Sequence, residues 1–295
     1  MEKRLIPLLP VIIFIVIFSL SQMAGANDVG TSGANFLKIG VGARAAALGD
    51  AFTALTDDGS SIYWNPAGLT KIKNRQFFAT YNMWFQEISQ GYLSYVLPSE
   101  KSVWGFALNY TDMGKIQGYD ELGEPTYQFG ASNLLFQIAY AKNVGKDLSL
   151  GIAAGYLADT IDADQQAAFH TNIGLIKSLP SLDVGLAIQN LGSSLKEDPL
   201  PLTYKVGFAL KMSSFNLSFD VAFPADNKTH FVAVGLEVPL SQTFTLRAGS
   251  RYNRYVDSEF SCGLGFNLEK VSFDYAYVPY ARLGDTHRVS MGLKL

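Results

Sequence analysis

The chain has 295 residues, of which 48% are hydrophobic, 13% aromatic and only 17% charged. Soluble domains usually carry about a quarter charged residues, so this composition argues against an ordinary soluble domain. A net charge of −3 with mixed signs gives no reason to expect a nucleic-acid partner. Because Cys262 is the one cysteine in the sequence, no internal disulfide can form.

Residues 1–26 predict a secretory signal peptide. A short charged start precedes the uncharged apolar run 5–20, and Ala24-Gly25-Ala26 supplies a small-residue cleavage site. A membrane anchor is the alternative, but this run is short for a helical span, and no later uncharged run reaches about 18 residues. No cysteine lies near the cleavage site, which argues against a lipoprotein. We therefore expect export with cleavage after Ala26.

The rest of the chain alternates with the period of two that is typical of β-strands. Trp104, Phe106 and Leu108, for example, alternate with Gly105 and Ala107. One face is large and apolar and the other small or polar, as in barrel strands with lipid outside and a filled or wet lumen inside. Each run is near the 9–11 residues of a tilted membrane strand. The predicted strands are 77–85, 89–97, 102–111, 133–143, 147–157, 168–177, 181–190, 203–211, 214–223, 229–238, 243–252, 259–268, 270–279 and 286–295.

These fourteen runs predict an all-β, 14-stranded antiparallel outer-membrane β-barrel over residues 76–295. The connections alternate between short ones and mostly longer ones, such as 112–132, 158–167 and 191–202. Outer-membrane barrels have short periplasmic turns and longer external loops, so we expect the longer set outside the cell. An even number of strands then places both termini in the periplasm.

An exported soluble β-sandwich or solenoid is the rival fold. Its outward faces would carry Thr, Lys and Glu rather than Phe, Tyr and Leu. An apolar band of this extent would aggregate in water, so we prefer the barrel.

Residues 27–75 predict a compact plug with short helices in the barrel lumen. Strong helix formers predict a helix over Arg44–Leu55, and Asp58 or Ser60 is placed to cap a second short helix that ends at Trp64. A turn is expected before Pro66, and Gly68 is expected to let the backbone turn towards the first strand. The plug residues singled out are Gly40, Gly42, Arg44, Gly49, Asp57, Asp58, Asn65, Pro66, Ala67 and Gly68.

Residues 40–45 also match the G-x-G-x-x-A dinucleotide-binding pattern, with Asp57 and Asp58 downstream. The match is weak because no strand of a βαβ unit precedes it. We therefore expect no nucleotide cofactor.

Residues 36–69, FLKIGVGARAAALGDAFTALTDDGSSIYWNPAGL, resemble the start of the PorV/PorQ family of outer-membrane proteins. These proteins are relatives of the FadL long-chain fatty-acid transporters, whose Asn-Pro-Ala element is matched by Asn65-Pro66-Ala67. Asn190-Leu191-Gly192 followed by Leu200-Pro201 is similar to the family's NLG…LP stretch. The external loops are short for either group.

The resemblance implies two possible functions, both non-enzymatic. In FadL-type proteins the N-terminal segment is a hatch, and hydrophobic ligands bind beside it and leave sideways through the wall. PorV-type proteins take part in type IX secretion and carry cargo proteins to a surface attachment complex. We take secretion as the leading hypothesis, with secreted cargo or secretion components as partners. The alternative is diffusive transport of fatty acids or similar hydrophobic molecules. Outer-membrane lipid surrounds the barrel in either case.

By the alternation, several charged side chains face the lumen: Lys205, Asp220, Glu237, Arg247, Arg251, Asp274, Arg288 and Lys294. Buried charges must be paired, so we expect mainly a ladder of ion pairs that holds the plug, with Arg44 and Asp50 or Asp57 contributing. A carboxylate-binding site built on Arg247 or Arg251 is the alternative. The three histidines match no metal spacing, and His287 with Ser290 would be the nearest candidates for an enzyme site. We expect no metal, no cofactor and no catalytic residue.

Overall fold

The computed structural model describes residues 32–225, 230–253, 256–280 and 284–295. The predicted signal peptide, residues 1–26, and the first residues of the predicted plug lie outside the described residues.

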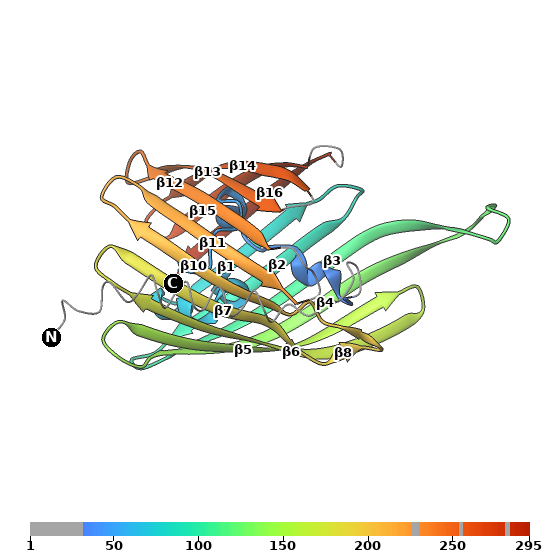
Figure 1. Ribbon diagram of the computed structural model, residues 1–295, viewed down its shortest axis with the longest axis horizontal. Helices are drawn as coiled ribbons and strands as arrows, with labels where there is room; N and C mark the ends of the chain where they lie inside the picture. The colour runs from blue at the N-terminus through green and yellow to red at the C-terminus, as the bar shows by residue number, and fades with distance from the viewer. Residues whose placement is uncertain (1–31, 226–229, 254–255, 281–283) are drawn as a thin grey trace.

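Fourteen antiparallel strands close into a barrel, as the sequence predicts (Figure 1). Strand β1 pairs with β16, from Gln76 opposite Lys294 to Met83 opposite His287, so the sheet has no free edge. The barrel strands are β1 (Gln76–Met83), β2 (Ser89–Pro98), β3 (Val103–Tyr119), β4 (Pro125–Asn143), β5 (Leu148–Ile161), β6 (Asp164–Ser178), β7 (Leu182–Gly192), β10 (Thr203–Lys211), β11 (Asn216–Pro224), β12 (Phe231–Pro239), β13 (Phe244–Asn253), β14 (Val256–Asn267), β15 (Val271–Tyr280) and β16 (Gly284–Lys294). A separate two-stranded sheet, β8 (Ser194–Leu195) with β9 (Asp198–Pro199), lies between β7 and β10 in the chain.

The two faces of the wall have the chemistry that the alternation predicts. Along β3, Trp104, Phe106 and Leu108 point outward and are exposed, whereas Ala107 and Asn109 point inward and are buried. The outward band is the surface that lipid covers in an outer-membrane barrel. Among the described residues, no helix is long and apolar enough to cross a membrane.

The long hairpins differ from the prediction. Residues 112–132 were expected to form a loop, but β3 and β4 continue through most of it, and their pairing reaches Tyr119 opposite Pro125. The resulting ribbon projects beyond the barrel (Figure 1). Residues 158–167 likewise form the ends of β5 and β6 around a short turn. The period-two signal is lost here because these strand ends lie beyond the lipid, so neither face has to be apolar.

Residues 32–75, called here the luminal segment, run through the inside of the barrel. The segment contains η2 (Asn35–Lys38), α2 (Ala43–Ala47), α3 (Ser61–Trp64) and η3 (Pro66–Lys71). It starts beside β9, where the Gly33 nitrogen donates to the Pro199 oxygen at 2.9 Å, and it enters β1 at the short-turn end. The expectation that both ends of the chain lie on the same side therefore does not hold for its first described residues. Leu295 does lie at the short-turn end, where its nitrogen donates to the Arg75 oxygen.

The first predicted helix is shorter than expected. It was predicted over Arg44–Leu55, but α2 ends at Ala47, and Gly49 and Asp50 follow with φ of 64° and 67°. A Cβ on Gly49 would lie 2.8 Å from the backbone of Ser250 in the wall. The wall therefore stops the helix, and glycine allows both the close approach and the left-handed backbone.

The predicted end of the second helix and the turn after it are confirmed, but its N-cap residue Ser60 makes no side-chain capping hydrogen bond and Gly68 does not have the expected role. Helix α3 ends at Trp64, and Asn65 has extended backbone, as expected of a residue before proline. Gly68 lies inside η3 rather than at a turn. A Cβ there would lie 2.5 Å from Cγ2 of Thr56, so Gly68 is required for packing within the luminal segment.

Inward glycines of the wall allow the luminal segment to approach closely. A Cβ on Gly151 of β5 would overlap the peptide between Pro66 and Ala67. A Cβ on Gly249 of β13 would overlap the backbone of Leu48 and Gly49. The two sides of the lumen thus contact the segment backbone directly.

Replacing Gly151 by alanine should loosen the segment without preventing barrel formation. Forcing an extra methyl group into a packed site typically costs about 1–3 kcal/mol. The temperature at which the folded gel band converts to the unfolded one should therefore fall for Gly151→Ala. Gly91→Ala in β2 is the matched control, because a Cβ there meets nothing within 4 Å. Equal midpoints for the two variants would contradict the packing described above.

Candidate functional site in the lumen

Asn65 connects the luminal segment to two strands of the wall. Its side chain is fully buried, and Nδ2 donates to the carbonyl oxygens of Thr53 at 2.9 Å, Leu175 at 3.2 Å and Leu186 at 3.3 Å. Its Oδ1 accepts from the Ala67 nitrogen at 3.2 Å. An amide has two donor hydrogens for these three acceptors, so one hydrogen is shared. One side chain therefore fixes the turn and joins it to β6 and β7.

A chain of ion pairs connects the start of the luminal segment to the wall. Nε of Arg44 and Nε of Arg247 each lie 2.7 Å from Oε2 of Glu237. Arg44 also contacts Asp57 at 2.5 Å, and Arg247 contacts Asp274 at 2.7 Å. The guanidinium of Arg247 is thus occupied by two carboxylates, an arrangement that matches the expected ladder. Arg247 does not line the main luminal cavity.

Arg251 forms a second group of ion pairs on β13. Its Nη1 lies 2.8 Å from Asp50 in the luminal segment, and its Nη2 lies 2.6 Å from Glu259 on β14. The guanidinium carbon also lies 5.8 Å from the centre of the Phe231 ring. Arg251 lines the cavity while both of its carboxylate partners hold it in place.

The other predicted plug residues pack within the luminal segment. A Cβ on Gly40 would lie 2.9 Å from the Trp64 ring. Gly42 precedes α2 with φ of 92° and faces Ser60. Oδ1 of Asp58 accepts from the nitrogen and the hydroxyl of Ser60 at 2.8 and 2.5 Å, which orders the turn before α3. These residues shape the segment and do not contact the strands' charged groups.

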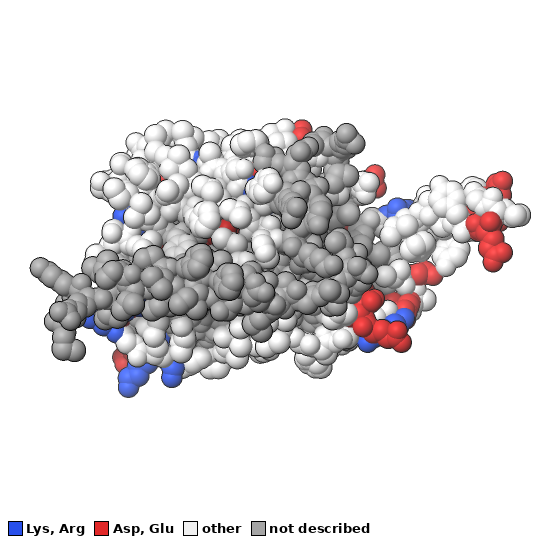
Figure 2. Space-filling view, in the orientation of Figure 1, with Lys and Arg blue, Asp and Glu red and all other residues white. Residues whose placement is uncertain are grey.

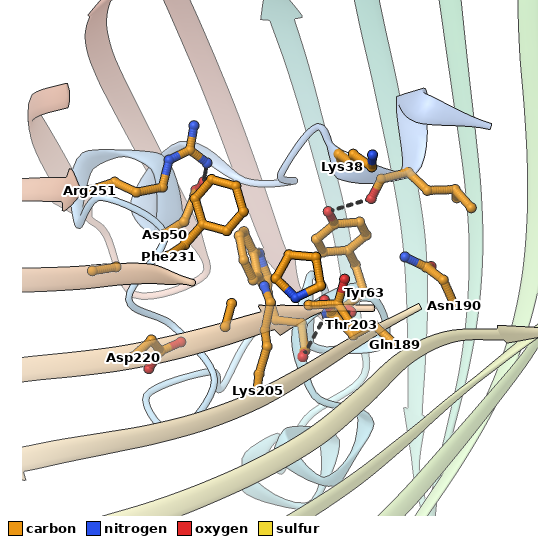
Figure 3. Close-up of a pocket in the computed structure, with 15 residues that line it drawn as sticks. Lys38, Asp50, Tyr63, Gln189, Asn190, Thr203, Lys205, Asp220, Phe231 and Arg251 are labelled. Carbon is orange, nitrogen blue, oxygen red and sulfur yellow. Dashed lines mark hydrogen bonds and ion pairs between the residues drawn. The ribbon is translucent and has the colours of Figure 1, made fainter. Parts of the chain in front are cut away.

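A cavity of about 160 Å³ lies between the luminal segment and strands β7 and β10–β13 (Figure 3). Tyr63 forms part of its lining, and its hydroxyl donates to the Leu37 oxygen at 2.9 Å. Gln189 donates to the Tyr63 and Trp64 oxygens at 2.7 and 3.0 Å. The lining mixes aromatic, amide and charged side chains. The main contributors are Lys38, Asp50, Tyr63, Trp64, Gln189, Asn190, Thr203, Lys205, Asp220, Phe231 and Arg251.

Lys205 and Asp220 give the cavity its charge at the β10–β11 side. The Lys205 ammonium lies 4.4 Å from the centre of the Trp64 ring, a cation–π contact. Oδ2 of Asp220 accepts from the Phe52 and Thr53 nitrogens at 3.1 and 2.8 Å. Within the described structure Oδ1 of Asp220 has no hydrogen-bond partner. A ligand of this cavity would therefore meet a cation, a carboxylate and an aromatic face together.

The structure does not bring the candidate enzyme residues together. Ser290 points inward, where its hydroxyl accepts from the Ala43 nitrogen at 2.7 Å. His287 lies three positions earlier on the same strand and therefore on the opposite face, where it pairs with the Tyr275 hydroxyl at 2.8 Å. Across the described ranges, no cluster of potential ligands could hold a metal ion.

Several residues that line the cavity could not be recognised as such from the sequence. Lys205 and Asp220 were expected to face the lumen, but Tyr63, Gln189 and Thr203 were not singled out. Asn190 lies in the stretch that resembles the family's NLG element and adopts φ of 61°, at the point where the register of β7 with β6 shifts. A residue in this left-handed conformation is uncommon outside glycine, and asparagine is among those that tolerate it.

Asn65→Ala should destabilise the luminal segment more than its small change in volume suggests. Three carbonyl oxygens and one amide nitrogen would lose their partner in a buried site, and an unsatisfied buried group costs about 1–3 kcal/mol. We expect faster trypsin cleavage within residues 32–75 in detergent, while the barrel stays resistant. Asn267→Ala, at an exposed asparagine at the end of β14, is the control. If Asn65→Ala is cleaved at the same rate as the wild type, the Asn65 side chain does not hold the luminal segment to β6 and β7.

Glu237→Ala should have a larger effect than removal of a surface ion pair. It would leave Arg44 and Arg247 without their shared carboxylate, and breaking a buried pair from one side costs roughly 3–5 kcal/mol. The exposed pair of Lys196 with Asp164 provides the comparison, because such pairs contribute about 0–1 kcal/mol. Urea-unfolding midpoints of Glu237→Ala and Lys196→Ala measure the difference. Similar midpoints would show that the luminal ladder does not hold the segment.

Solved structures of hydrocarbon transporters have a similar fold. The toluene transporter TodX of Pseudomonas putida matches with a TM-score of 0.68 and 12% identity over 86% of this chain and 96% of that one. The monoaromatic hydrocarbon channel CymD matches with a TM-score of 0.67 and 13% identity, over 87% and 98% of the two chains. A FadL homologue of Pseudomonas aeruginosa matches with a TM-score of 0.61 and 12% identity, over 92% and 100%. At this identity the likeness concerns the fold alone.

Sequence comparison gives a more specific result. A UPF0164 protein of Treponema pallidum (strain Nichols) is 30% identical over an alignment of 177 residues, and the match covers 52% of this chain and 43% of that protein. The chain thus spans less than half the length of this relative. The model of the family described as Type IX secretion system protein PorV matches residues 22–240, most of the chain. With its closed fourteen-stranded barrel and its occupied lumen, this chain belongs to the PorV family of outer-membrane proteins.

Proposed function

We propose that this protein is a closed outer-membrane barrel that serves type IX protein secretion as a binding component. In this role it receives cargo proteins or secretion components at its surfaces and takes part in surface attachment. One observation carries the proposal: the luminal segment occupies the barrel from the β8–β9 end to the short-turn end. Gly151, Asn65 and Glu237 hold it against the wall. A secreted protein then has no path through this lumen and must be bound outside it.

The size and chemistry of the main luminal cavity support the same proposal. Its volume of about 160 Å³ is small compared with the roughly 300–1,000 Å³ of ordinary ligand pockets. Lys205, Asp220 and Arg251 line it, so an apolar ligand would have to be held beside charged groups. The role is non-enzymatic on this proposal, since the candidate residues His287 and Ser290 face opposite ways.

Uptake of a small hydrophobic molecule is the second candidate, and two observations favour it. The fold is similar to that of TodX and CymD, which are described as hydrocarbon transporters. A cavity of about 150 Å³ can hold one benzene molecule when its lining is apolar. Here Trp64 and Phe231 offer aromatic faces, but the charged groups beside them make the fit poorer.

Removing the protein from the bacterium that makes it should separate the two functions. The secretion role predicts that a set of exported proteins disappears from the cell surface and the medium and accumulates in the periplasm. Quantitative surface proteomics measures this, and re-expression of the intact chain should restore it. Lys205→Met should restore it equally, because that substitution alters only the luminal cavity.

The opposite pattern would overturn the proposal. An unchanged set of surface proteins, together with slower uptake of toluene or oleate that Lys205→Met fails to restore, would assign the barrel to small-molecule transport. Gel migration of Lys205→Met before and after heating shows whether the variant is folded.

A further inference from the structure

The short-turn end of the barrel has a broad basin at its centre. Its volume is about 680 Å³, several times that of the luminal cavity. Lys71 and Lys73 at the end of the luminal segment form one side, and inward residues of the wall, such as Gln76 and Ser149, form another. The basin is therefore the mouth of the lumen at the end with short turns, the periplasmic end in outer-membrane barrels.

Five lysines line this basin, from four separate stretches of the chain. Two of them are paired with a buried carboxylate: Lys71 and Lys211 lie 2.8 and 2.5 Å from the same oxygen of the fully buried Asp183. The other three, Lys73, Lys146 and Lys294, are exposed, and Lys73 donates to the Thr70 carbonyl oxygen at 2.8 Å. In the part of the chain that the structure describes, none of these three has a carboxylate within ion-pair distance.

The acidic residues of the basin do not neutralise the exposed lysines. Asp57 is paired with Arg44, and Asp147 lies 3.6 Å from Lys177. The basin therefore has an excess of positive charge over a concave surface, which attracts anions and raises their local concentration.

The charged side chains of the whole molecule are also distributed unevenly between the two ends of the barrel. Lys and Arg side chains gather at the short-turn end, and Asp and Glu side chains gather at the ends of the long hairpins (Figure 2). Exposed basic residues at this end of the barrel include Arg75, Lys101, Lys142 and Lys270. The acidic ends of the long hairpins include Asp120, Glu121, Glu124, Asp162 and Asp164. An acidic partner is thus attracted to one end and repelled from the other.

We propose that the basin binds an acidic segment of a periplasmic protein. Its volume lies in the range of pockets that enclose a sizeable ligand and exceeds what a single small anion fills. Its lining includes no arginine, the residue suited to fixed two-pronged recognition of phosphate. Flexible lysines instead suit several carboxylates in a segment of variable sequence. Lipid headgroups surround the outer wall, whereas the basin is enclosed by inward residues and the luminal segment.

This inference adds to the proposed function by giving the chemistry of a periplasmic partner, but its test does not depend on that function. The intact mature protein is placed in nanodiscs of zwitterionic lipid. Fluorescence anisotropy then measures binding of a fluorescein-labelled oligoglutamate peptide at physiological salt. We expect saturable binding that the triple variant Lys73→Gln, Lys146→Gln, Lys294→Gln weakens on the order of tenfold, as loss of three exposed ion pairs would.

A matched triple variant distinguishes binding in the basin from general electrostatic attraction to this end of the barrel. Arg75→Gln, Lys101→Gln, Lys270→Gln removes the same charge at the same end but outside the basin, and binding should stay within about twofold of the wild type. Lys71 and Lys211 are kept because they hold the buried Asp183. Equal weakening by both triples, or no binding by the wild type, would overturn the proposal.

Two further measurements identify the kind of anion that the basin binds. Inorganic phosphate at the same total charge should displace the peptide only weakly, and replacing part of the lipid by an anionic phospholipid should leave the affinity unchanged. Full displacement by phosphate would assign the basin to small anions, and loss of peptide binding in anionic nanodiscs would assign it to lipid headgroups. Either result would contradict the assignment to an acidic protein segment while leaving the secretion role untested by this assay.

Discussion

Direct contact between the backbone of the luminal segment and the barrel wall is the constraint on which the rest of the structure depends. Gly151 and Gly249 lie on opposite sides of the lumen, and neither position has room for a Cβ beside the segment. The same contact ends α2 early, because Gly49 meets the Ser250 backbone where the helix would continue. Once the segment is seated in this way, what remains inside the lumen is a small cavity, and larger partners are left with the two ends of the barrel.

Buried ion pairs also fix the position of the luminal segment against the wall. Glu237 is shared by Arg44 from the segment and Arg247 from the wall, so each charge has a partner inside the lumen. Such a pair is weak evidence for net stability, because desolvation opposes the attraction. It does specify position, since a shifted segment would leave Arg44 and Glu237 unpaired. The exposed lysines at the basin have the opposite property, because in the described chain no side-chain carboxylate pairs with Lys73, Lys146 or Lys294, and they remain available to an anion.

The barrel was predictable from the sequence because lipid on one side and packed groups on the other impose a period of two on every strand. The outer ends of β3 and β4 were not, because around Lys115 and Gln117 both faces meet water and the period disappears. Alternation also placed Glu237 and Arg247 on the inner face, but their pairing required the register of β12 with β13, which sets them directly opposite each other. The end of α2 depends on Ser250, far along the chain. The basin was missed because its lysines come from the luminal segment, one turn and the ends of β10 and β16, which only closure of the barrel brings together.

Conductance in planar bilayers shows directly whether the luminal segment closes the barrel. The intact protein should conduct little current, and deletion of residues 33–69 should raise the conductance sharply, because the strands carry their own apolar outer face and the emptied lumen would fill with water. The deletion protein must first show the β-dominated circular dichroism and the heat-dependent gel migration of a folded barrel. If that folded deletion protein conducts no better than the intact one, the luminal segment does not close the barrel, and the proposal that partners are bound only at its surfaces loses its physical basis.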